Sequence, residues 1–138
     1  IGCAEGYYAI GFVLRNPDAK IFAYDINDTA RTLCRQMSEL NQVAKNVMIE
    51  KEFSPETFKQ IPQDTPTLII CDCEGYESVL FSEPTVAYLS NTTLLIETHD
   101  FLNPEISVRL EQLLTSSHSI QFIQSVDDIL KAKYEILP

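Results

Sequence analysis

The segment Ile1-Gly2-Cys3-Ala4-Glu5-Gly6 decides the fold class. It is typical of a β-strand end followed by a tight glycine-rich turn, and apolar residues at helical spacing continue from Tyr7 toward Asn16. The glycines permit unusual backbone angles and let a ligand approach the main chain, although a packing or turn role is the alternative. The strand leading into such a turn lies in the middle of a doubly wound sheet, and here it would precede Ile1. We therefore expect a domain that is truncated at its N-terminus.

Outward from this turn, short apolar runs alternate with amphipathic segments, which predicts an α/β fold with a parallel sheet. Strands are predicted at 21–24, 47–49, 68–71, 94–96 and 120–123, and helices at 28–40, from Ser54, after Gly75 and over 104–114. The runs 68–71 and 94–96 are apolar throughout, which predicts strands buried on both faces. Asp28 or Thr29 is the expected cap of its helix. No linker interrupts residues 1–138, so we expect one domain, with the segment from Val126 less certain.

Composition excludes several classes of protein. The chain has 138 residues, 45% of them hydrophobic, and its 10 Lys+Arg against 20 Asp+Glu give a net charge of −10. The apolar content excludes a wholly disordered chain, and the negative charge disfavours nucleic acid as a partner. The apolar runs are too short to cross a membrane, and no secretion signal is visible. We therefore expect a cytoplasmic location and no membrane partner.

A carboxylate follows the first complete strand. Asp25 stands roughly 20 residues after the glycine turn, where it can accept hydrogen bonds from both hydroxyls of a ribose. A solvated strand-end aspartate is the alternative. Turn and carboxylate together favour a nucleoside-containing ligand, including a nicotinamide dinucleotide, although Ala4 interrupts the Gly-x-Gly-x-x-Gly pattern of that cofactor.

Further acidic residues follow the next two strands. The segment Asp72-Cys73-Glu74-Gly75-Tyr76-Glu77 comes after one apolar run, and Glu97-Thr98-His99-Asp100 ends the next. Carboxylates gathered at a buried strand end are costly unless something cationic or hydrogen-bonding lies there, although a solvated loop with Glu77 on the outer helix face is the alternative. His99 is a candidate for proton transfer, because histidine is the residue type that most often serves as a general acid or base near neutral pH.

The four cysteines do not form a metal motif. Cys34 belongs to the core stripe of its helix, which leaves Cys3, Cys71 and Cys73. A structural zinc site usually has two paired motifs and four ligands. We expect reduced, packed thiols and no metal site.

These motifs together resemble the FkbM-type S-adenosylmethionine-dependent methyltransferases. The resemblance rests on the segments 1–8, 23–28, 46–47, 72–77 and 96–99, and spans about the whole of residues 1–100. It implies a Rossmann-like class I methyltransferase sheet, mostly parallel and seven-stranded, with its first strand largely missing from this chain. It also implies S-adenosylmethionine as cofactor and O-methylation of a small-molecule or carbohydrate acceptor.

The resemblance also assigns site residues. The glycine turn would wrap the methionine part of the cofactor, Asp25 would hold the ribose, and residues 52–53 would lie near the adenine. The positions implied to bind cofactor are Gly2, Cys3, Ala4, Glu5, Gly6, Tyr7, Asp25, Ile26, Glu52, Phe53 and Asp72. Asp72, Glu74 or His99 could accept the proton of the acceptor hydroxyl.

The chain departs from the family pattern at four positions. Ala4 replaces an asparagine, Asp25 a glutamate, Ile26 a proline and Ile70 a lysine. A domain that binds cofactor or acts as a scaffold without transferring methyl groups is therefore the second hypothesis. A nicotinamide-dependent oxidoreductase is the third.

Overall fold

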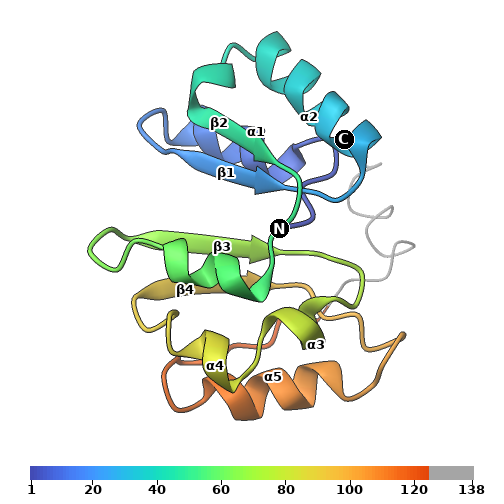
Figure 1. The fold of residues 1–138 in the computed structure, drawn as a ribbon, viewed down its shortest axis with the longest axis vertical. Helices are drawn as coiled ribbons and strands as arrows, with labels where there is room; N and C mark the ends of the chain where they lie inside the picture. The colour runs from blue at the N-terminus through green and yellow to red at the C-terminus, as the bar shows by residue number, and fades with distance from the viewer. Residues whose placement is uncertain (125–138) are drawn as a thin grey trace, which may run out of the picture.

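The structure is a computed structural model, and it describes residues 1–124. It is an α/β fold, so the predicted class is confirmed (Figure 1). Its elements are α1 (Tyr7–Arg15), β1 (Ile21–Tyr24), α2 (Asp28–Leu40), the 3-10 helix η1 (Ala44–Asn46), β2 (Val47–Glu50), the 3-10 helix η2 (Pro55–Gln60), β3 (Thr67–Cys71), α3 (Glu77–Leu80), α4 (Glu83–Val86), β4 (Thr92–Ile96) and α5 (Ile106–Leu114).

The strands form two parallel pairs that meet at the first residue of the chain. β1 pairs with β2 from Ile21 opposite Val47, and β3 pairs with β4 from Thr67 opposite Thr92. Ile1 lies between the pairs: its amine donates to the Ile70 carbonyl at 2.7 Å, and its carbonyl accepts from the Asp72 N–H at 3.0 Å.

On the other side, the N–H groups of Gly2 and Cys3 donate to the Tyr24 carbonyl, each at 2.9 Å. The spatial order is therefore β2, β1, Ile1, β3, β4, and the carboxyl ends of the strands lie at one edge.

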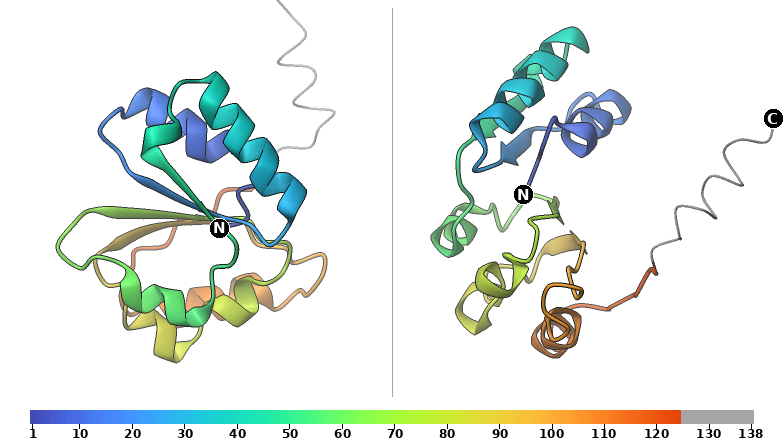
Figure 2. Two further views of the ribbon diagram at one scale, coloured as in Figure 1. Left: turned by 45° about the horizontal axis from the view of Figure 1, so that its top comes forward. Right: turned by 90° about the vertical axis from the view of Figure 1, so that its right-hand side faces the viewer.

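Each strand pair has its own hydrophobic core. α1 and α2 pack against β1 and β2 around Ile10, Val13 and Cys34, whereas η2 and α3–α5 enclose a second core around Phe58, Phe81 and Leu110. Figures 1 and 2 show these two halves, one on either side of the N-terminus. Ile1 packs against the second core and Cys3 against the first, so the glycine turn connects them.

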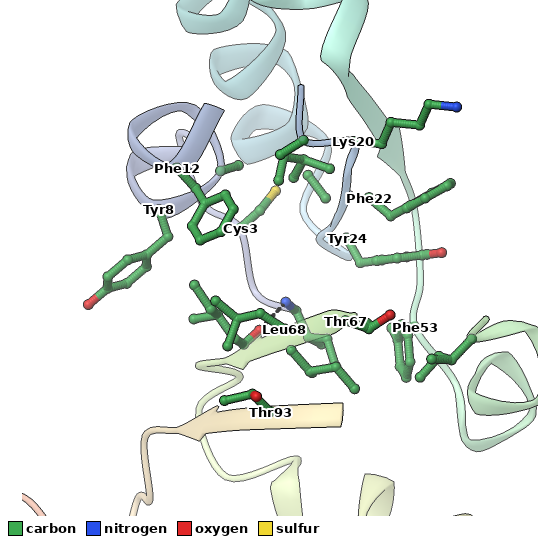
Figure 3. A pocket seen from close by; sticks show the side chains of 18 of the residues that line it. Cys3, Tyr8, Phe12, Lys20, Phe22, Tyr24, Phe53, Thr67, Leu68 and Thr93 are labelled. Atoms are coloured by element: carbon green, nitrogen blue, oxygen red, sulfur yellow. Dashed lines mark hydrogen bonds between the residues drawn. The ribbon is translucent and has the colours of Figure 1, made fainter. Parts of the chain in front are cut away.

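A cavity of about 1010 Å³ separates β1 from β3 (Figure 3). Phe22 and Tyr24 lie on its β1 side, and Thr67 and Leu68 on its β3 side. Residues 21–24 of β1 and residues 67–70 of β3 line it from its two sides. Because its walls are strand edges, we do not assign it to a small ligand, and the candidate site lies at the carboxyl edge instead.

Several finer predictions are wrong. The described residues hold four strands in two sheets rather than seven in one, and residues 120–123 form no strand, with Phe122 and Ile123 exposed. Burial of β3 and β4 on both faces also fails, because Leu68 on β3 is 41% exposed and Leu95 on β4 is 46% exposed. The segment from Val126 lies outside the described residues.

Local helix details differ as well. Asn27, not Asp28 or Thr29, caps α2, and its side chain accepts from the N–H groups of Thr29 and Ala30. Asn27 is the last extended residue, so its side chain reaches back over the first turn of the helix.

The structure also bears on membrane-spanning helices and on the state of the cysteines. Within residues 1–124, no helix has the length and apolar character needed to cross a membrane. All four cysteines are free thiols, Cys34 and Cys71 buried and Cys3 and Cys73 half-buried, as predicted.

Candidate functional site

The predicted site residues gather at the carboxyl edge of the strands. The turn that follows Ile1 contacts the end of β1 through Tyr24 and the end of β3 through Asp72. The loop after β3 and the loop after β4 meet where His99 lies beside Asp72 and Glu74. Parallel strand order therefore brings together residues that are far apart in the sequence.

The glycines of the turn are required by the protein's own packing. Gly2 has φ of +73°, and a Cβ there would lie 1.7 Å from the Asp72 carbonyl oxygen. Gly6 has φ of +94°, and its Cβ would lie 2.8 Å from the Sγ of Cys34. The packing explanation for the Gly-x-x-x-Gly segment is thus supported, while cofactor contact stays a prediction.

Asp25 fixes the same turn. Its Oδ2 accepts from the Ala4 N–H and its Oδ1 from the Asn27 N–H, both at 2.9 Å. Ala4 has φ of +45°, a conformation that costs a residue with a side chain some free energy. A carboxylate oxygen has two lone pairs, so each oxygen of Asp25 can accept a further hydrogen bond from a ligand hydroxyl.

The N-terminus of α1 opens onto this turn. Gly6 offers no side-chain cap, and the first turn of the helix carries no acidic residue. The first backbone N–H groups of a helix have no partner within it and carry partial positive charge. An anionic group such as a carboxylate would be stabilised there. Tyr7, which follows Gly6, and Ile26, which follows Asp25, are each 76% exposed and present apolar surface.

The strongest polar cluster surrounds His99, which is 5% exposed. Its Nδ1 lies 3.0 Å from Oε1 of Glu77, and its Nε2 lies 3.5 Å from both Oδ1 of Asp72 and Oε2 of Glu74. All three predicted catalytic residues are therefore brought together.

Glu77 was not among the predicted site residues, and the alternative that placed it on an outer helix face is wrong. It is fully buried, and its Oε1 also accepts from the Cys73 N–H at 3.1 Å. Its Oε2 has no hydrogen-bond partner among residues 1–124. Because Glu77 belongs to the same acidic segment as Asp72, it could have been named as a site residue from the sequence. Its contact with His99, which is 22 residues away, is visible only in the structure.

The thiols of Cys73 and Cys3 are held protonated by raised pKa values. Sγ of Cys71 lies 3.5 Å from Sγ of Cys73, and this hydrogen bond, with burial and the nearby Glu77, raises the pKa of Cys73. Burial raises the pKa of Cys3 to about 12, with Cys34 and Asp25 adding to the shift. These groups are therefore poor nucleophiles at neutral pH.

The two residues predicted to lie near the adenine, Glu52 and Phe53, differ in burial. Phe53 is buried and packs edge-on against Tyr24 and Phe58, with ring centroids 5.0 and 4.8 Å apart. Glu52 is exposed. Phe53 thus belongs to the core, where it also lines the cavity between β1 and β3.

Comparisons with protein families, curated proteins and solved structures find no match to the chain.

Proposed function

We propose that the chain is the catalytic domain of a cytoplasmic S-adenosylmethionine-dependent methyltransferase that methylates a hydroxyl group of a small-molecule or sugar-like acceptor. One observation carries the proposal. The glycine turn tied to Asp25 and the cluster of Asp72 and His99 lie at the carboxyl ends of the two neighbouring parallel strand pairs. Such an edge, at the point where the strand order reverses, is where open α/β sheets bind their ligands.

The turn supplies complementary groups for the cofactor. The free N–H groups of α1 suit the carboxylate of the methionine part, and the unused lone pairs of Asp25 suit the ribose hydroxyls. Asp72 at the end of β3 would face the sulfonium, whose positive charge a carboxylate stabilises.

Methyl transfer places few chemical demands on the protein. The acceptor oxygen forms a bond to the methyl carbon while the carbon–sulfur bond breaks, which leaves a neutral thioether. Alignment of the two reacting groups therefore supplies most of the rate. His99 Nε2 would take the hydroxyl proton, because Glu77 accepts from Nδ1 and leaves Nε2 as the acceptor.

Titration of S-adenosylhomocysteine into the protein, followed by calorimetry, tests cofactor binding. We expect binding in the micromolar range or tighter, weakened in Asp25→Ala because the ribose loses a charged acceptor worth roughly 1.5–3 kcal/mol. Absence of binding at high micromolar concentration contradicts the proposal.

Transfer is tested separately with labelled S-adenosylmethionine and a panel of hydroxylated acceptors. We expect His99→Ala to lower turnover and to leave cofactor affinity little changed. Cofactor binding without transfer to any acceptor favours the scaffolding hypothesis, to which Ala4 and Ile70 pointed. Preferred binding of reduced nicotinamide dinucleotide favours an oxidoreductase.

A further inference from the structure

The cluster around His99 contains more hydrogen-bond acceptors than donors. The carboxylates of Asp72, Glu74 and Glu77 all face one imidazole ring. Glu77 accepts both from the Cys73 N–H and at Nδ1 of His99, so the neutral ring carries its proton on Nδ1 and a lone pair on Nε2. In the neutral form of the ring, three electron-rich atoms converge: Nε2 and one oxygen each of Asp72 and Glu74.

The His99 side chain is more than nine-tenths buried, at 6% exposed, and its Nε2 points into this group. Among residues 1–124, Nε2 makes no hydrogen bond, because the 3.5 Å separations from the two carboxylate oxygens exceed the usual range. A buried ring whose Nε2 faces two carboxylates without a hydrogen bond, beside the buried and unpartnered Oε2 of Glu77, indicates a ligand that supplies the missing charge.

The distances fit a metal ion. In a tetrahedral zinc site with metal–ligand bonds of roughly 2.0–2.2 Å, neighbouring ligand atoms lie about 3.4 Å apart. The two Nε2–oxygen distances are 3.5 Å, and all three candidate ligand atoms lie within 4.8 Å of one another.

We propose that Asp72, Glu74 and His99 form a binding site for a divalent first-row metal ion of the zinc type. The mixture of imidazole and carboxylate favours such an ion over Mg²⁺ and Ca²⁺, which take oxygen ligands. Glu77 is a positioning residue: a metal-binding histidine usually donates its second N–H to a carboxylate, and the 3.0 Å contact at Nδ1 supplies that partner.

The site is built on backbone that brings its ligands together. Glu74 has φ of +54° and Gly75 of +96°, so the loop turns sharply after β3 and returns Glu74 and Glu77 toward the same ring. The Glu74 side chain is 80% exposed and that of Asp72 36%, which leaves an open side. Three protein ligands with an open fourth position are the arrangement of catalytic rather than structural zinc sites.

A neighbouring group, Cys71, Cys73 and Glu77, could also hold a metal ion. We place the ion at Nε2 instead, because Cys71 is fully buried and the two thiols already satisfy each other by a hydrogen bond at 3.5 Å. The proposed site has no cysteine ligand, so it is distinct from the cysteine zinc motif that the sequence lacks. If the methyltransferase proposal also holds, on which this one consequence rests, the metal-bound Nε2 would no longer take the acceptor's proton. The open position would instead take the acceptor hydroxyl and lower its pKa, so that the proton leaves to solvent.

Direct metal binding tests the proposal without reference to any activity. Zn²⁺ is titrated into the 138-residue protein by calorimetry in competition with a chelator, and Co²⁺ is followed by its visible absorption. We expect one equivalent of metal and a cobalt spectrum without strong thiolate charge transfer. Glu74→Gln should weaken binding at least tenfold, and Glu77→Gln roughly 10–100-fold.

Glu74→Gln is the decisive variant because its exposed side chain makes no contribution to the core, and Glu111→Gln, an exposed carboxylate on α5, is the matched control. Circular dichroism confirms that each variant is folded. The proposal is overturned if wild type binds no metal, or if Glu74→Gln binds as tightly as Glu111→Gln. It is also overturned if a Cys71→Ala, Cys73→Ala double variant loses the metal while Glu74→Gln retains it.

Discussion

Replacing Gly2 with alanine should separate the turn from β3. The new Cβ would lie 1.7 Å from the Asp72 carbonyl oxygen, whereas real Cβ contacts stay above 3.0 Å, so the backbone must move by at least 1.3 Å (3.0 minus 1.7). That movement strains the Asp72 N–H to Ile1 carbonyl bond at 3.0 Å. The φ of +73° adds about 1–2 kcal/mol for a residue with a side chain, and overpacking adds about 1–3.

We therefore expect Gly2→Ala to lower the free energy of unfolding by about 2–5 kcal/mol, a large share of the 5–15 kcal/mol typical of a domain. With roughly 2.1 cal/mol/K of unfolding entropy per residue, a loss of 3 kcal/mol lowers Tm by about 10 °C. Urea unfolding and a thermal melt measure both quantities.

Gly11→Ala is the control, because Gly11 lies inside α1 and a Cβ there meets nothing within 4 Å. Alanine should stabilise this helix by about 0.5–1 kcal/mol. If Gly2→Ala costs less than about 1 kcal/mol, or behaves like the control, the close approach of the turn to β3 is refuted.

Three further perturbations test the turn and its surroundings. Asp25→Asn should destabilise the protein by about 1–3 kcal/mol, measured in urea, because the Ala4 and Asn27 N–H groups lose a charged acceptor; an unchanged midpoint contradicts this role. The Ser107 backbone N–H holds the pKa of Asp100 below its usual range. The Asp100 carboxylate therefore stabilises the fold above its unfolded pKa of about 3.9, and this contribution is lost as pH falls through the lower folded pKa. Asp100→Asn should make the free energy of unfolding less dependent on pH at the acid end, and an equal loss of stability in both proteins argues against this role. Cys3, with its pKa raised to about 12, should react with iodoacetamide at pH 8 far more slowly in the folded protein than in urea, as peptide mass spectrometry can measure.

Apolar runs and strand-end carboxylates were sufficient to predict the elements of the fold. Each of the four strands lies within a residue or two of its predicted position, because a short apolar run bounded by polar residues has few other uses. The same logic failed at 120–123, since an apolar run forms a strand only where it pairs with another, and none of the described strands pairs with it.

The sequence was sufficient to predict which residues form the site, but not which contacts they make with one another. Asp72, Glu74 and His99 follow adjacent parallel strands, and topology alone brings them to one edge. Glu77 was left out of the predicted site because a glutamate in a short helix is usually solvated, and only the fold reveals the buried histidine that it contacts. The hydrogen bond between Asp25 and Ala4 likewise depends on a turn geometry that residue types do not specify.

The division of the apolar interior into two cores has a consequence for how the protein opens. Each half can lose its amide protection in a separate local unfolding event, since few side chains span the boundary and the residues Ile1 to Cys3 form the bridge. A ligand that binds this bridge and the end of β3 stabilises only molecules in which both halves are closed. Hydrogen exchange in the two halves would then become a single cooperative process, and the free protein would behave as two folding units that its ligand converts into one.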